Sequence, residues 1–139
     1  MAAHHENGFA TWFERVAGIG VVANLALAVP TLLAPEQMLA LASLPPAVPL
    51  LWARFAALLL VLLSLFYLPA VYDCLRYRSV AWLSVGARLA GVLFFATQPA
   101  DYRLFGLFDL VFFIPEAILL LLAGPQPLPG AVHVEGRRV

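Results

Sequence analysis

Seven polar side chains lie within stretches of the sequence that are otherwise apolar. They comprise three arginines, three carboxylates and one amide: Glu14, Arg15, Asn24, Arg54, Arg88, Asp109 and Glu116. A charge at the centre of a bilayer costs at least about 2.5–3.5 kcal/mol, so such residues normally face the interior of a helix bundle and find partners there. The equal numbers of arginines and carboxylates predict ion pairs inside a membrane protein.

Position along each apolar stretch predicts which side chains form an outer pair. At about 1.5 Å of rise per residue, Arg54 and Asp109 each lie about 9 Å inside the same boundary of the bilayer. We therefore expect these two residues to pair. Asp109 and Glu116 are seven residues apart, so both side chains project from one face of their helix.

The same reasoning predicts an inner group near the opposite boundary. Glu116 lies at about the level of Glu14 and Arg15, and we expect these three to meet. Arg88, at the middle of its stretch, is expected between the outer pair and the inner group, within reach of either carboxylate of the last stretch. Asn24, midway along the first stretch, is placed to hydrogen-bond into the same cluster.

Two interpretations of this cluster stay open. In the structural one, buried ion pairs fix the order and register of the helices. In the functional one, the side chains form a polar pathway for a proton, an ion or an anionic headgroup, with Arg88 as the binding cation. Full charge balance favours the structural interpretation, because a transport site usually leaves some binding capacity unpaired.

Redox and metal chemistry have few candidate ligands in this chain. His4, His5 and His133 all lie in terminal segments, so no apolar stretch carries the axial histidine of a membrane haem. The single cysteine, Cys74, excludes an iron–sulfur cluster and a cysteine zinc site. We expect no catalytic residue, no metal site and no cofactor bound by the chain's own side chains, while a lipid or quinone at a helix interface stays open.

Four apolar stretches must position these residues, and together they predict an all-α fold. The stretches cover about residues 9–33, 48–67, 79–97 and 103–123. Each reaches the about 17–25 residues that a spanning helix needs, and none alternates as a barrel strand does. We predict one membrane domain over residues 1–139, a four-helix transmembrane bundle running up-down-up-down. A short interfacial helix is expected within Ala34–Pro45, and an extended tail over residues 124–139.

Aromatic and basic residues predict how the bundle sits in the membrane. Six aromatic side chains at the expected span ends are predicted to anchor at the interfaces: Trp12, Trp52, Trp82, Tyr67, Tyr72 and Tyr102. The side that holds both termini would carry five arginines, Arg15, Arg76, Arg78, Arg137 and Arg138, against Arg103 alone on the other. Since arginine resists translocation, we expect both termini in the cytoplasm and the protein in a bacterial inner membrane.

Small residues predict where helices approach one another closely. Gly18 and Gly20 fall in a G-x-G-x-x-A pattern that also occurs in dinucleotide sites, but such sites need a preceding strand. We therefore interpret this pattern as a helix-contact face. Gly86 with Ala90, and likewise Ala87 with Gly91, are spaced four apart, which predicts that the third span is central in the bundle.

Composition excludes several classes of protein. The chain has 139 residues, of which 63% are hydrophobic and 12% charged, with a mean hydropathy of +0.93. A soluble chain is about 45–50% apolar and about 25% charged. The net charge of zero excludes a nucleic-acid binder that relies on phosphate attraction. With no soluble domain in view, we do not expect an independent enzyme.

The region from the second span to the fourth resembles a known group of proteins. Tyr67, Asp73, Arg76 and Arg78 end the second span, a Gly86-Ala87-Arg88 triplet follows in the third, and the fourth opens with G-L-F-D-L from Gly106 to Leu110. Over about residues 48–123 this pattern resembles the DoxX-like small four-helix bacterial membrane proteins. The resemblance implies a membrane subunit of an oxidoreductase complex near the quinone pool.

These observations lead to one expected function and two alternatives. We expect a non-catalytic integral membrane subunit, an anchor or scaffold of a respiratory or photosynthetic redox assembly, with other membrane subunits and lipids as partners and no nucleic acid. The alternative is a small homo-oligomeric transporter or proton or anion pathway that uses Arg88, Asp109 and Glu116. A lipid-modifying enzyme is the third class, because carboxylates at an interface can serve as acid and base.

Overall fold

The computed structural model describes residues 8–124. All regular secondary structure in this part of the chain is helical. Its elements are α1 (Gly8–Leu33), α2 (Pro35–Leu41), α3 (Leu51–Tyr72), α4 (Arg78–Ala96), the 3₁₀ helix η1 (Ala100–Tyr102) and α5 (Arg103–Leu122). The predicted all-α class is confirmed. The expected tail after Gly124, the three histidines and two of the orienting arginines, Arg137 and Arg138, lie outside the described residues.

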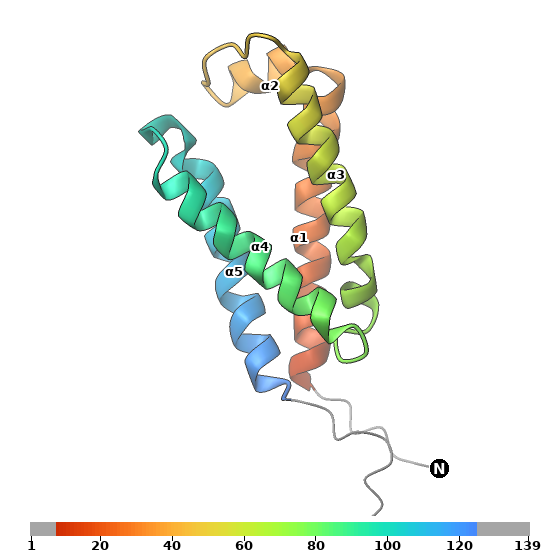
Figure 1. The fold of residues 1–139 in the computed structure, drawn as a ribbon. Coiled ribbons are helices and arrows are strands. Elements are labelled where there is room, and N and C mark those ends of the chain that lie inside the picture. The colour runs from red at the N-terminus through yellow and green to blue at the C-terminus, as the bar shows by residue number, and fades with distance from the viewer. Residues whose placement is uncertain (1–7, 125–139) are drawn as a thin grey trace, which may run out of the picture.

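Four of these helices, α1, α3, α4 and the stretch Ala100–Leu122, are long and apolar enough to cross a membrane. They run up-down-up-down, so that the start of α1 and the end of α5 lie at the same end of the bundle (Figure 1). The short α2 follows the first span at the other end, as expected. We call these the terminal end and the α2 end of the molecule.

The short helix after the first span, α2, is shorter than the sequence predicts. It begins at Pro35, where a proline in the first turn costs no hydrogen bond, but it ends at Leu41 rather than near Pro45. Ser43 adopts a positive φ of 55°, and the amides of Ser43 and Leu44 donate to the carbonyls of Ala40 and Leu39. This pairing is a Schellman closure, which turns the chain out of the helix before the prolines are reached.

The second span also differs from its predicted bounds of 48–67. It starts at Leu51 because Val48 precedes a proline, and a residue before proline disfavours helical backbone. It continues to Tyr72 although Pro69 lies inside it, since the residues around Pro69 remain apolar and spanning helices tolerate proline. The other three spans begin and end within one residue of the predicted bounds.

The first span, and not the third, is central in the bundle. α1 packs along α3 and also against α5, whereas α4 packs mainly on α5. Gly18 makes the approach of α1 to α3 close, because a Cβ there would lie 3.3 Å from the Val71 side chain. Gly86 has open space around it. Of the two pairs whose spacing predicted a contact face on α4, Gly86 with Ala90 is exposed and has no neighbouring helix, whereas Gly91 of the other pair lies against Asp109 of α5.

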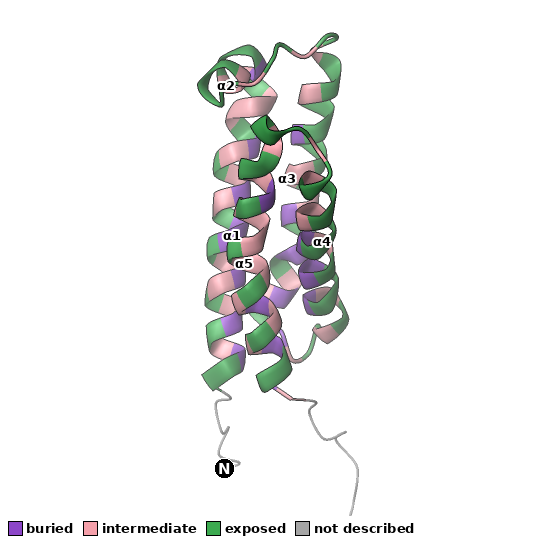
Figure 2. Cartoon of the chain, turned by 90° about the vertical axis from the view of Figure 1, so that its left-hand side faces the viewer, coloured by how far each residue is buried: buried purple, intermediate pink, exposed green. Residues whose placement is uncertain are grey.

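The closed core lies at the terminal end. Its buried side chains come from the start of α1, the end of α3, the following loop, the start of α4 and the end of α5: Ala10, Phe13, Ala17, Ala70, Cys74, Ala81, Val85, Leu120 and Ala123. Buried residues follow the inward faces of the helices, and exposed residues face outward (Figure 2). Toward the α2 end the α4–α5 hairpin leans away from α1 and α3 (Figure 1).

Candidate functional site

A buried ion cluster lies where the bundle begins to open. Arg88 of α4 is only 4% exposed, and its Nε donates to Glu116 Oε1 at 3.0 Å. Its Nη1 lies 3.5 Å from Asp109 Oδ1. The guanidinium carbon also lies 4.7 Å from the centre of the Phe112 ring, within cation–π range. We call Arg88, Asp109 and Glu116 the ion cluster.

Two helices and two glycines position this cluster. Asp109 and Glu116 lie two turns apart on α5, so both carboxylates face the same α4 side chain, as their spacing predicts. A Cβ at Gly20 of α1 would collide with the Arg88 guanidinium, and one at Gly91 of α4 would collide with the Asp109 carboxylate. The two glycines therefore provide the space that the charged groups occupy.

The cluster is not balanced in charge or in hydrogen bonds. It holds one arginine against two carboxylates, where equal numbers across the spans had suggested full pairing. Among the described residues, Glu116 Oε2 and the Tyr67 hydroxyl are buried without a hydrogen-bond partner. The nearby Ser84 hydroxyl donates instead to the carbonyl of Ala81 in its own helix. The balance that favoured a purely structural role is therefore absent at the centre of the bundle.

The predicted outer pair of Arg54 with Asp109 is wrong. Arg54 is exposed on α3 and makes no ion pair within the described part of the chain. Equal depth is not sufficient for pairing, because α5 packs against α4 and α1 rather than α3. Asp109 pairs with Arg88 instead.

The predicted inner group is wrong as well. Glu14 turns to the loop after α3 and accepts a hydrogen bond from the Cys74 amide at 3.1 Å. Arg15 is exposed, with its guanidinium carbon 5.3 Å from the Trp12 ring centre. These two neighbours in sequence point in different directions around α1, so only one faces the bundle. Glu116 pairs with Arg88 instead. This agrees with the prediction that Arg88 lies within reach of either carboxylate of α5, and in the structure it contacts both.

Tyr67 is not an interfacial side chain. It is 3% exposed and faces the inside of the bundle near the ion cluster, and α3 continues more than a turn past it. Of the other predicted anchors, Trp12, Trp52, Trp82 and Tyr72 are exposed and Tyr102 is half-buried, all close to helix ends. Their anchoring in a bilayer stays a prediction.

An apolar groove opens above the ion cluster toward the α2 end. It has a volume of about 630 Å³ and lies between α1 and α3 on one side and α5 on the other, with α2 and η1 at its mouth. Asp109 lines it, and so does Asn24, which is 4% exposed and donates to no group of the described residues. Asn24 therefore shares the groove with Asp109, but the predicted hydrogen bond from Asn24 into the ion cluster is not formed.

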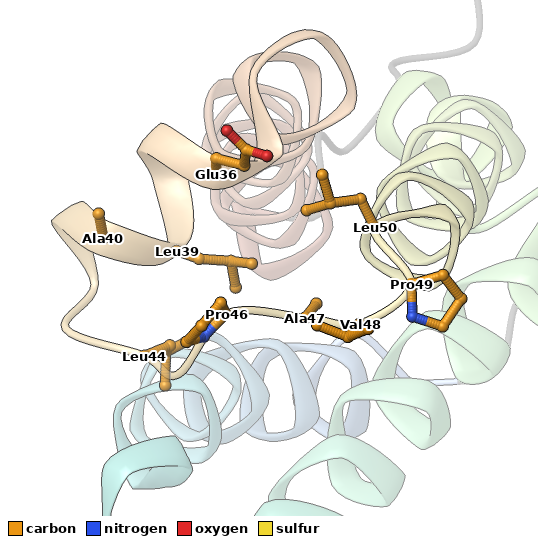
Figure 3. A pocket seen from close by; sticks show the side chains of 9 residues that line it. All are labelled: Glu36, Leu39, Ala40, Leu44, Pro46, Ala47, Val48, Pro49 and Leu50. Carbon is orange, nitrogen blue, oxygen red and sulfur yellow. The ribbon is translucent and has the colours of Figure 1, made fainter.

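A second cavity adjoins this groove at the tip of the molecule. It has a volume of about 580 Å³, is formed by α2 and the loop that follows, and shares Leu39 and Leu44 with the groove. Figure 3 shows its side chains, among which Glu36 alone is charged. Glu36 is exposed, so this cavity has no buried polar group that would recognise a ligand.

Two contacts at the terminal end were not foreseen from the sequence. Cys74 is fully buried, and burial together with the nearby Glu14 carboxylate raises the pKa of its thiol to about 12. Arg78 donates to the carbonyls of Leu120, at 3.3 Å, and Gly124, at the end of α5. A basic side chain near a helix C-terminus commonly caps its last carbonyls, but only the tertiary structure shows that Arg78 caps α5.

Comparison with known proteins adds no family to these observations. No protein-family model, no curated protein and no solved structure matches this chain. The resemblance to DoxX-like proteins therefore stays a prediction.

Proposed function

We propose that this protein is a non-catalytic integral membrane subunit that holds a lipid-soluble molecule in its groove. The observation that supports this is the position of the groove, which lies between spanning helices and ends on the polar groups of Asn24 and Asp109. An apolar part of the ligand would lie between α1–α3 and α5, and its polar end would meet the ion cluster.

The size and lining of the groove support this proposal. Small-molecule sites are usually clefts of about 300–1,000 Å³ with apolar walls and a few placed polar groups, and the groove of about 630 Å³ falls within this range. Its walls are mainly leucine, alanine and phenylalanine side chains. Pairing with Arg88 keeps the Asp109 carboxylate at the inner end, so the polar group is held in place before a ligand arrives.

The outer surface supports a role as a subunit. Large apolar side chains point away from the bundle on every span, among them Ile19, Phe66, Leu93 and Val111. Such a surface needs lipid or the helices of other membrane proteins around it. A redox assembly near the quinone pool of a bacterial inner membrane is the setting that the sequence resemblance implies, and it is part of this proposal.

Purification in a mild detergent, with mass spectrometry of both proteins and lipid extract, tests the proposal. A lipid-soluble molecule should be retained, together with other membrane subunits. Ala53→Phe, which fills the groove, should lose the molecule, whereas Ala90→Phe on the exposed face of α4 should keep it. Recovery of the chain alone, or equal retention by both variants, contradicts the proposal.

A proton or ion pathway is the second candidate, and the unbalanced ion cluster favours it. One arginine faces two carboxylates, and both Glu116 Oε2 and the Tyr67 hydroxyl are buried without partners among the described residues. Such groups have free capacity for a proton or a cation. Flux into liposomes that Glu116→Gln abolishes would support a pathway, whereas flux that this variant leaves unchanged would exclude the ion cluster from it.

A further inference from the structure

We infer that the groove selects a lipophilic cation, an organic molecule with a positive charge embedded in an apolar body. This inference rests on the proposed function, because it specifies the ligand class of the same groove. Three observations support it: the charges that line the groove, the aromatic side chains beside them, and the position of the nearest arginine.

The charged side chains that line the groove are all acidic. Asp109 lies at its inner end and Asp101 near its mouth, and no arginine of the described residues is among its lining side chains. Even Arg103, which lies between the lining residues Tyr102 and Leu104 in sequence, points elsewhere. An anion would meet two carboxylates and no cation, so charge complementarity favours a positive ligand.

Four aromatic side chains line the same groove as the two carboxylates. Phe95 of α4, Tyr102 of η1, and Phe105 and Phe108 of α5 all line the groove. Rings present a negative face to a cation, and this attraction grows where water is excluded. Aromatic walls combined with carboxylates are the usual recognition chemistry for a quaternary ammonium or phosphonium group, whereas a small hydrated ion would lose its water here without replacement.

The position of Arg88 leaves the negative charge of Asp109 available. Arg88 is 4% exposed and lies behind the carboxylates, while Asp109 is 22% exposed. The guanidinium is shared between Asp109 and Glu116, so one positive charge is divided over two negative ones. A neutral acceptor such as a quinone would find the Asn24 amide and the Tyr102 hydroxyl as donors along the groove walls, since the hydroxyl of Thr31, which also lines the groove, already donates to the carbonyl of Leu27.

Two ions of equal size and opposite charge test the inference on the full chain. Binding of tetraphenylphosphonium and of tetraphenylborate is measured by equilibrium dialysis in detergent micelles, with empty micelles subtracted. We expect the cation to bind at least about tenfold more tightly than the anion. Equal or reversed affinities would overturn the inference, and this comparison needs no variant that has to fold.

Substitutions then show which side chain is responsible for the preference for the cation. Asp109→Asn should weaken tetraphenylphosphonium binding about tenfold, because the carboxylate at the inner end is lost while Arg88 keeps Glu116 as a partner. Asp73→Asn is the matched control: Asp73 is an exposed carboxylate at the terminal end, and its removal should leave the Kd unchanged. An unchanged Kd in Asp109→Asn, shown folded by its helical circular dichroism, would overturn the inference.

The experiments distinguish failure of the inference from failure of the proposed function. If both ions bind equally and Ala53→Phe abolishes both, the groove holds lipid-soluble molecules without regard to charge, and only the inference falls. If neither ion binds and Ala53→Phe changes nothing in the lipid extract, both the inference and the proposed function fall.

Discussion

At the scale of single residues, Arg88 is the residue around which the buried charged groups inside the spans are arranged. Its guanidinium meets Glu116, Asp109 and the ring of Phe112, and Gly20 provides the space beside it. Burying a charge is tolerated when its partners and hydrogen bonds are in place, and removing one member leaves the others uncompensated. Substitutions that remove one of these groups should therefore have large effects on the free energy of unfolding.

Arg88→Gln removes the one cation of the cluster and should lower the free energy of unfolding by about 3–5 kcal/mol, because two carboxylates then remain buried together. Arg54→Gln is the control, since Arg54 is exposed and makes no ion pair in the described part of the chain. Denaturation in detergent, followed by circular dichroism, measures both. Equal stabilities of the two variants would contradict the assignment.

Gly20→Ala should destabilise the protein by about 1–3 kcal/mol, since the added Cβ collides with the Arg88 guanidinium. Gly86→Ala adds the same methyl group to a helix with nothing within 4 Å, and should be neutral or stabilise by up to about 1 kcal/mol through helix propensity. Thermal unfolding of both variants checks the difference. A stable Gly20→Ala protein would mean that α1 does not approach Arg88 closely.

Cys74 should react slowly with maleimide at pH 7–8, because its thiol has a pKa of about 12 and no exposed surface. The ordinary pKa of this thiol is 9.0, so it contributes stability that is fully present below that pH and is lost as the pH rises toward 12. Glu14→Gln removes a nearby negative charge and should lower the pKa. The pKa of the Cys74 thiol is measured from the rate of maleimide labelling as a function of pH, in folded and in denatured samples. Rapid labelling of the folded protein would refute the buried position of Cys74.

At the scale of elements, helix ends decide where the spans begin and stop. The turn at Ser43 ends α2 before Pro45 and Pro46 are reached, and Pro69 is accommodated inside α3. At the terminal end, Arg78 holds the last carbonyls of α5, and Glu14 holds the Cys74 amide of the loop after α3. Both contacts join the start of one element to the end of another, which fixes the terminal end as the closed part of the bundle.

Arg78→Gln should destabilise the protein by about 1.5–3 kcal/mol, the range for hydrogen bonds that involve a charged group, because the α5 carbonyls of Leu120 and Gly124 lose their donor. Arg76→Gln is the matched control, since Arg76 is exposed and its guanidinium carbon lies 5.5 Å from the centre of the Tyr77 ring, away from the end of α5. Hydrogen exchange at the end of α5 should rise in the first variant alone. Unchanged exchange there would argue against the cap.

At the scale of the whole molecule, the bundle has two unlike ends. The terminal end is closed by small and apolar side chains, whereas the α2 end opens into the groove, and the ion cluster lies between them. Few residues of each span are buried, so the molecule presents a wide apolar surface to its surroundings. The site proposed for a ligand is therefore formed by the divergence of the two hairpins and not by one helix.

Arginine distribution predicts that the terminal end faces the cytoplasm. Ser43→Cys at the α2 end should react from outside intact cells with a membrane-impermeant maleimide, and Ser79→Cys at the terminal end only after permeabilisation. Both serines are exposed, and the native Cys74 is buried. The opposite labelling pattern would reverse the orientation.

The fold class could be predicted from the sequence because it depends on local properties. A continuous apolar run of about 20 residues has to form a helix in lipid, where every backbone group needs an internal partner. The order of the spans and the short helix after the first followed from run length and proline positions. Spacing on one helix placed Arg88 within reach of either carboxylate of α5, but the partners that the sequence predicted for Asp109 and Glu116 were wrong.

Only the tertiary structure decided which helices are neighbours and which way each one is turned. Arg54 and Asp109 have equal depth, yet their helices do not pack together, so the charges do not pair. Tyr67 faces inward although it resembles an interfacial residue in sequence, and Asn24 and Asp109 come together at the inner end of a groove. Depth is a property of one helix, whereas pairing and cavities depend on the rotation and tilt of several, which are set by packing between distant residues.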